Sequence, residues 1–183
     1  EDKRISWSMA KSFLSAMFGT VVADGRIKSL DDTVDAYVPR LKGTVYEGVT
    51  VRNVLRMSSG VKFDEDYEAF DSDINRMGRV LALGGSMDDF AAGLEARERE
   101  QGTVRQYTSI DTHILGMVLR AVTGKDLLAL MEETLWSKLG AEDDAIYLTD
   151  GYGVAFALGG LNMRSRDYAR FGQMMLDGGR ADG

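Results

Sequence analysis

A serine and a lysine stand three residues apart, Ser8 and Lys11 in the stretch SWSMAKS, at the head of a long apolar helical pattern. Three residues along a helix amount to about 4.5 Å, so the two side chains share a face and the amine can reach the hydroxyl. A helix N-terminus also carries positive partial charge and N–H groups that favour an alkoxide or an oxyanion. Ser8 is therefore a candidate nucleophile for acyl transfer.

A structural explanation of this pair stays open. A free lysine amine has a pKa of about 10.4, so a lysine base needs burial or a neighbouring charge, which the Phe, Leu and Met residues of the helix would supply. Alternatively, the helix is an ordinary capped one whose lysine extends to solvent. A second S-x-x-K match, Ser59 with Lys62, is set aside because Gly60 is the expected end of the preceding helix.

Few residues are available as a third catalytic group. His113 is the only histidine, it falls inside an apolar helical pattern, and no G-x-S-x-G exists, so a Ser-His-Asp triad is poorly supported. Tyr107, in RQYTSID, directly precedes a helix expected from near Ser109, so its phenol is placed on a loop. The alternative is a core tyrosine with one hydrogen bond.

Candidate binding residues occur in two further places. The acidic stretch FDEDYEAFDSD, residues 63–73, has no clean period and predicts a surface loop, in which Asp66 and Tyr67 are candidates for binding a cationic or amine-bearing substrate end. A merely solvated loop is the alternative. Asn162, which follows GGL, is a candidate polar residue of the cleft, or else a turn residue.

Helical periodicity dominates the chain. Strand and turn signals gather at 145–161, and Gly124 and Gly140 are expected to end two of the helices. A capping-box-like start is formed by Ser29 and Asp32. Helices are expected over residues 8–23, 29–38, 50–57, 74–83, 86–97, 109–123, 125–139 and from 165 onward. The predicted fold class is mainly α, with little strand.

Composition narrows the function classes. The 183 residues are 44% hydrophobic, which suits one globular domain. The formal charge is −7, with 29 acidic and 22 basic residues and no basic block, which argues against nucleic acid or an anionic membrane surface as a partner. No apolar run approaches the 18 or so residues of a membrane span. With no cysteine and one histidine, a metal site would need carboxylates, and none is predicted.

Several of these motifs together resemble one family. SMAKS, then YTS about a hundred residues later, then GGLNMRSRDYARFGQMML, are similar to the serine β-lactamase and penicillin-binding-protein superfamily. DGRIKSLDD, VTVRNVLRMSSGV and SIDTHILGMVLRAVTGK resemble it too, so the resemblance covers essentially the whole chain. SWSMAKSF, and Y-x-S in place of Y-x-N, look closest to the class C-like branch of esterases and amidases that includes 6-aminohexanoate-dimer hydrolases.

This resemblance implies roles for four residues. Ser8 would be the acyl-forming nucleophile, Lys11 its activating base, and Tyr107 the phenol that carries protons to and from the leaving group. Ser109 would hydrogen-bond Lys11 or the substrate. The implied activity is hydrolysis of small esters or linear amides, with a small molecule as partner and no cofactor. A β-lactamase or D-alanyl-D-alanine peptidase, and a non-catalytic helical binding module, are the alternatives.

The sequence departs from the family pattern in its third motif. The family has a Lys or His, a small residue and Gly on a late strand, whereas this chain contains neither K-[ST]-G nor H-x-G. That strand also supplies an oxyanion N–H, whose loss typically costs about 10²–10³ in rate. We therefore expect residues 1–183 to form a single domain incomplete at both ends, a helical-domain fragment of the α/β fold with most strands outside the chain.

Overall fold

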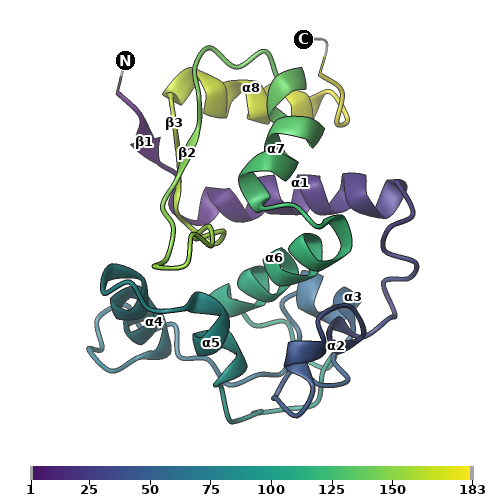
Figure 1. Ribbon diagram of the computed structural model, residues 1–183, viewed down its shortest axis with the longest axis vertical. Coiled ribbons are helices and arrows are strands. Elements are labelled where there is room, and N and C mark those ends of the chain that lie inside the picture. The colour runs from purple at the N-terminus through teal and green to yellow at the C-terminus, as the bar shows by residue number, and fades with distance from the viewer. Residues whose placement is uncertain (1, 182–183) are drawn as a thin grey trace.

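The computed structural model describes residues 2–181, in which helices dominate and strands are short (Figure 1). The helices are α1 (Ala10–Ala23), α2 (Val34–Tyr37), α3 (Val51–Leu55), α4 (Asp73–Ala82), α5 (Met87–Ala92), α6 (Ser109–Thr123), α7 (Leu127–Thr134) and α8 (Ser165–Leu176). Short 3-10 helices occur at Trp7–Met9, Pro39–Leu41 and Trp136–Lys138, and the strands are β1 (Arg4–Ile5), β2 (Ile146–Tyr147) and β3 (Leu161–Met163). The predicted fold class, mainly helical with little strand, is confirmed.

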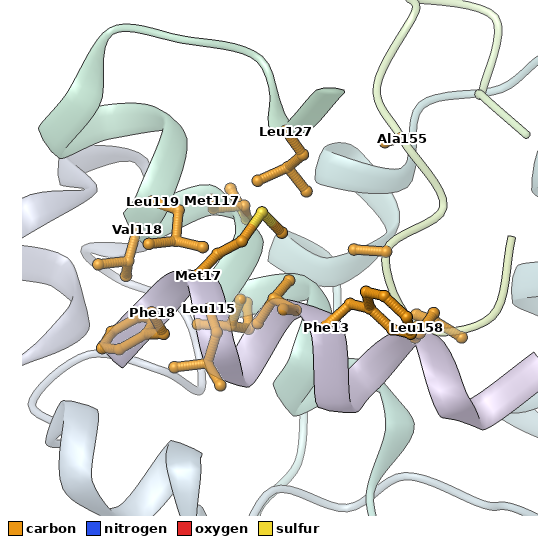
Figure 2. Packing of buried hydrophobic residues seen from close by; sticks show 14 of the residues in the cluster. Phe13, Met17, Phe18, Leu115, Met117, Val118, Leu119, Leu127, Ala155 and Leu158 are labelled. Carbon is orange, nitrogen blue, oxygen red and sulfur yellow. The ribbon is translucent and has the colours of Figure 1, made fainter. Parts of the chain in front are cut away.

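The core forms where α1 crosses α6. Helix α1 lies between α6, with α2 to α5 beyond it, and a second layer made of α7, α8 and the strands (Figure 1). Figure 2 shows the α1 side chains of Phe13, Met17 and Phe18 packed against α6 and α7 residues that include Leu115 and Leu127. Each buried side chain of this size contributes about 1.5–3 kcal/mol. This packing fixes the axis of α1, and with it the position of the residues at its start.

Helix α6 is buried on almost every face. Eleven consecutive residues, from Ser109 to Leu119, are buried, although several of them are polar. The helix ends as predicted at Gly124, whose φ of 68° lies in the left-handed region that glycine adopts without strain. A buried helix needs partners for its polar side chains within the protein. Asp111 Oδ1 and His113 Nε2 have such partners, whereas Ser109 Oγ and Asp111 Oδ2 have none among the described residues.

A small antiparallel sheet joins the beginning of the chain to its last third. The strand order is β1-β3-β2, with Ile5 paired to Asn162 and Tyr147 paired to Leu161. The backbone N–H of Ser6 donates to the Leu161 carbonyl at 2.7 Å. The sheet therefore holds the turn that precedes α1 beside residues 158–161.

Three predicted helices are shorter than expected. Helix α2 is limited to Val34–Tyr37 and begins after Thr33, not at Ser29. Its end has a clear cause, because Val38 precedes a proline and adopts the non-helical φ and ψ of −121° and 85°. Helix α5 ends at Gly93, and α7 gives way to the 3-10 helix at Trp136–Lys138. Within residues 2–181, no helix has both the length and the apolar character that crossing a membrane requires.

Candidate active site

Three side chains converge at the start of α1: Ser8, Lys11 and Tyr107, which we call the serine cluster. The hydroxyl of Tyr107 donates to Ser8 Oγ at 2.7 Å, and Lys11 Nζ donates to the same oxygen at 3.1 Å. Lys11 Nζ also lies 5.2 Å from the centroid of the Tyr107 ring, a cation–π distance. The predicted convergence of these three groups is confirmed, whereas their catalytic roles belong to the proposal below.

Ser8 sits in the 3-10 turn that leads into α1. Its neighbour Trp7 has a φ of 44°, in the left-handed region that a bulky residue rarely adopts. The turn is held by Ser6, whose backbone N–H binds β3 and whose hydroxyl donates to the Trp7 carbonyl at 3.0 Å. Ser8 is exposed at the surface of this braced turn, two residues before α1 begins.

Lys11 is half-buried, and it is not enclosed by the buried Phe and Leu residues of its own helix. Phe13 and Leu14 are fully buried because they face the core, while Lys11 lies on a different face of the helix. Its ammonium donates to the Leu158 carbonyl at 2.8 Å as well as to Ser8 Oγ. Two neutral oxygens therefore hold the amine in place, and the Leu158 contact has no local signal in the sequence.

Tyr107 reaches the cluster from the loop before α6, with 41% of its surface exposed. Partial burial alone would raise the pKa of its phenol. The hydrogen bond with Ser8 and the nearby Lys11 ammonium outweigh burial, so the pKa of Tyr107 lies below its usual value of 10.0. The phenol is thereby better suited to give up and regain a proton near neutral pH.

Ser109 is the first residue of α6 and is completely buried. Its backbone N–H donates to Glu65 Oε1, and its Oγ has no hydrogen-bond partner among the residues that the structure describes. Glu65 also accepts a hydrogen bond from the Tyr67 hydroxyl at 3.0 Å. The sequence pointed to Asp66 and Tyr67 in this loop but missed Glu65, because nothing local indicates a contact across 44 positions.

A cavity of about 390 Å³ opens beside Ser8. Its polar lining comes from the serine cluster, the acidic loop, α4 and α6: Ser8, Lys11, Tyr67, Asn75 and Ser109. The rest of its lining is apolar or glycine: Ile5, Trp7, Ile74, Gly78, Leu81, Leu148, Phe156, Leu158 and Gly159. The structure thus brings four of the predicted site residues to one cavity, and Tyr107 to its edge through Ser8.

The other two predicted binding residues make local hydrogen bonds instead. Asp66 Oδ1 accepts from the backbone N–H groups of Glu68 and Ala69, at 2.9 and 3.3 Å, and so shapes the acidic loop. Asn162 lies in β3, not in a turn, and its side-chain amide donates to the Gly160 carbonyl at 2.9 Å. Neither side chain is part of the cavity lining formed by the described residues.

A second group of polar side chains surrounds α6, and we call it the α6 cluster: Tyr46, Asp88, Asp111, His113 and Arg120. Asp88 Oδ1 lies 2.8 Å from His113 Nε2 and accepts from Arg120 at 2.6 Å. Burial would raise the pKa of Asp88, but these two partners outweigh it and bring the pKa to about 2. His113 is 2% exposed and its Nε2 interacts with Asp88. It makes no hydrogen bond with the residues of the serine cluster.

Asp111 is the second buried carboxyl group of the α6 cluster. The hydroxyl of Tyr46 donates to its Oδ1 at 2.8 Å, while Oδ2 has no partner within residues 2–181. Burial raises the pKa of Asp111 to about 7, in spite of that hydrogen bond. Among the same residues, no group of three or more His, Asp or Glu side chains is placed to hold a metal ion.

Comparisons with known proteins match the chain to one family model and to several relatives. The family model described as Beta-lactamase matches residues 6–183. The 6-aminohexanoate-dimer hydrolase of Paenarthrobacter ureafaciens is 34% identical over 188 residues, which cover 100% of this chain and 48% of that protein. A Bacillus anthracis structure with a provisional 6-aminohexanoate-dimer hydrolase name superposes with a TM-score of 0.85 at 29% identity, over 99% of this chain and 49% of the other.

A more distant structure shares the fold. The D-stereospecific amidohydrolase from Streptomyces sp. has a TM-score of 0.75 at 22% identity, over 97% of this chain and 62% of that one. The chain spans about half the length of the first two relatives. The prediction that it represents the mostly helical portion of a larger fold is confirmed.

Proposed function

The chain belongs to the beta-lactamase family, and on that premise we propose that it is the nucleophile-bearing part of a serine hydrolase that forms an acyl-enzyme on Ser8. The observation that carries the proposal is the serine cluster itself. Ser8 Oγ lies within 3.1 Å of Lys11 Nζ and within 2.7 Å of a phenol 99 positions away, beside an open cavity. That arrangement of nucleophile and proton acceptors is what acyl transfer requires.

The first half-reaction would begin with attack of Ser8 Oγ on the carbonyl carbon of the substrate. The serine proton passes to the Lys11–Tyr107 pair, in which the Lys11 ammonium stabilises a Tyr107 phenolate that accepts this proton. A bond forms between Oγ and carbon, and the carbonyl π electrons move to oxygen. The positive end of α1 favours this oxyanion. When the oxyanion collapses, the bond to the leaving alcohol or amine breaks, and Tyr107 supplies the proton that the leaving group needs.

In the second half-reaction, water would hydrolyse the acyl-enzyme by the same steps in reverse. Its oxygen attacks the acyl carbon while its proton passes to the Lys11–Tyr107 pair, and collapse of the second intermediate returns a proton to Ser8 as the acid leaves. We assign the base to the pair, because a phenol and an amine this close share protons and titrate together. The lowered pKa of Tyr107 supports that assignment. No cofactor is needed for either half-reaction.

We propose small esters or linear amides as substrates. The curated relative at 34% identity is named for hydrolysis of a 6-aminohexanoate dimer, which supports the linear-amide class. The buried Ser109 Oγ, unpartnered among the described residues, is suited to bind Lys11 or the substrate as the reaction proceeds. A penicillin-type substrate is the alternative that the same nucleophile would serve.

Covalent labelling tests this proposal. The protein is incubated with a fluorophosphonate and, separately, with penicillin, and adducts are measured by intact mass and peptide mapping. We expect one fluorophosphonate adduct, on Ser8, that is absent in Ser8→Ala and retained in Ser15→Ala. Ser15 is a matched control because it is an exposed serine in α1, the helix that follows Ser8.

The other outcomes separate the alternatives. A penicillin adduct that persists on Ser8 favours a penicillin-binding or β-lactamase activity over the esterase. A folded protein that takes no adduct from either reagent contradicts both enzyme assignments and leaves the non-catalytic binding module.

A further inference from the structure

Most residues that line the cavity beside the serine cluster are apolar or glycine. Helix α4 contributes Ile74, Gly78 and Leu81, which are spaced four and three residues apart and so share one face. Leu148 and Phe156 extend the apolar lining from the segment between β2 and β3. This side of the cavity is suited to hydrocarbon, because such walls offer a ligand dispersion contacts and removal from water.

Gly78 leaves space in this wall that another residue would fill. It lies inside α4, where glycine is less favourable than alanine, and it is half-buried. A β-carbon at Gly78 would meet no heavy atom within 4 Å, whereas one at Gly116 in α6 would meet Leu127 at 3.3 Å. Gly116 thus permits close packing of helices, while the space at Gly78 belongs to the cavity.

No carboxylate of the acidic loop is among the described residues that line this cavity. Glu65 is engaged by the Ser109 N–H and the Tyr67 hydroxyl, and Asp66 by two backbone N–H groups of its own loop. The side-chain amide of Asn75 likewise donates to the Tyr67 carbonyl at 3.0 Å. Lys11, a cation, is the one charged side chain among the described residues of the lining, so a cationic chain would enter without a counter-charge.

The position of Tyr107 indicates which part of the substrate enters. Tyr107 approaches Ser8 Oγ from outside the set of described residues that line the cavity. In the proposed reaction the leaving group departs toward the phenol that protonates it. The acyl group stays on Ser8, and the cavity is the apolar space next to that oxygen.

We propose that this cavity is an acyl pocket for an uncharged aliphatic chain, and that Gly78 sets its depth. The inference rests on the proposed acyl-enzyme at Ser8 and deepens it. It narrows the proposed esters and linear amides to those with a neutral, medium-length acyl group. A 6-aminohexanoyl group, whose amine lies at the far end of the acyl chain, is expected to fit this pocket less well than a hexanoyl group.

The test measures how fast a series of fluorophosphonates labels Ser8. The probes carry methyl, butyl, hexyl and 6-aminohexyl groups on phosphorus, and each rate is divided by the rate of reaction of that probe with hydroxide. Each methylene that enters the pocket is expected to raise the rate about fourfold. Hexyl should therefore exceed methyl by at least about tenfold, and 6-aminohexyl should be slower than hexyl by a similar factor at pH 7.

Substitution of Gly78 tests the depth of the pocket. Gly78→Leu is expected to lower the hexyl-to-methyl rate ratio by about tenfold or more, because its side chain occupies the space of two or three methylenes. Gly172→Leu is the matched control, since Gly172 is an exposed α8 residue whose β-carbon would also meet no atom within 4 Å. Should Gly78→Leu fail to fold, Gly78→Ala is expected to lower the ratio about fourfold.

Three results would overturn the acyl pocket. Equal corrected rates for methyl and hexyl would show that no chain is bound, and faster labelling by 6-aminohexyl would show that the pocket binds a cation. An unchanged ratio in folded Gly78→Leu would remove Gly78 from the wall. Absence of any adduct from all four probes differs from these, because it would contradict the nucleophile assignment and the pocket together.

Discussion

The serine cluster and the α6 cluster are both groups of polar side chains within hydrogen-bond distance, but they differ in burial and in charge balance. Ser8 is exposed and Tyr107 is 41% exposed, and the oxygens that bind the Lys11 ammonium are neutral. In the α6 cluster, His113 is 2% exposed and a carboxylate, Asp88, lies against both it and Arg120.

This difference makes His113, the only histidine of the chain, a poor candidate for a catalytic residue. The paired group of Asp88, His113 and Arg120 within the α6 cluster resists a change of protonation, because its members are arranged for one charge state. The serine cluster has no carboxylate to hold its proton in one place, and it faces a cavity. We therefore expect proton transfer to depend on the serine cluster and stability to depend more on the α6 cluster.

The largest expected effect is on catalysis at the serine cluster. Tyr107→Phe and Lys11→Ala should each reduce ester hydrolysis and fluorophosphonate labelling by about 10²–10⁴, which corresponds to about 3–5 kcal/mol of lost transition-state stabilisation. If the two residues act as one base, the double mutant should lose little more than the worse single mutant. Initial rates of the two single mutants and the double mutant provide the measurement.

Two outcomes would change this view of the serine cluster. Losses that multiply in the double mutant would indicate independent roles for the lysine and the tyrosine. Near-wild-type hydrolysis in Tyr107→Phe would reduce this tyrosine to a packing residue and leave proton transfer to Lys11 and water.

A second large effect concerns Asp111 and pH. Its folded-state pKa of about 7 lies above the value of 3.8 usual for aspartate, so the folded protein holds this proton more tightly than the unfolded chain does. The stability that this proton contributes is fully present below about pH 4 and is lost as pH rises to about 7, at about 1.4 kcal/mol per pH unit.

Asp111→Asn tests this pH dependence, because an amide can accept from Tyr46 but does not titrate. Relative to the wild type, the stability of Asp111→Asn, measured as its free energy of unfolding, should increase by about 4 kcal/mol between pH 4 and pH 8. Urea denaturation across that range measures the difference. Parallel curves for the two proteins would show that Asp111 is not protonated in the folded state.

Removal of Asp88 should affect stability without affecting the serine cluster. Asp88→Ala leaves His113 and Arg120 without their carboxylate, which is expected to cost about 2–3 kcal/mol of unfolding free energy. Asp89→Ala is the control, because this neighbouring carboxylate is 65% exposed in its ion pair with Arg40 and should cost less than about 1 kcal/mol. Ser8 labelling measured well below the melting temperature should stay within about twofold of wild type in both variants. A tenfold loss of Ser8 labelling in Asp88→Ala would show that reactivity at the serine cluster depends on the α6 cluster.

The smallest expected effect is on stability at the serine cluster. Tyr107→Phe and Lys11→Met should each change the free energy of unfolding by no more than about 1 kcal/mol, since their hydrogen bonds are partly exposed to water. Chemical denaturation of the two variants checks this expectation. A loss above 2 kcal/mol in either would mean that the serine cluster supports the fold as the α6 cluster does.

Local patterns in the sequence were sufficient for much of the fold. The apolar spacing predicted α1, α4 and α6 to within about two residues, and Gly124 marked the end of α6. The same local logic placed Ser8 and Lys11 together, because residues three apart on a helix are neighbours. Tyr107 was a candidate because of its place on the loop before α6, but its role as a proton carrier came only from the family resemblance, since no periodicity relates it to Ser8 across 99 positions.

The sequence by itself thus determined most of the helices and the Ser8–Lys11 pair, and it gave poor support to a histidine triad; these conclusions depend on contacts within a turn or on composition. Only the tertiary structure decided that the Leu158 carbonyl holds Lys11, that Glu65 caps the buried Ser109, and that α4 forms the wall of the cavity. The physical reason is the distance along the chain. Contacts across 44 or 147 positions form where packing of whole elements brings backbone groups together, and no short stretch of residues encodes them.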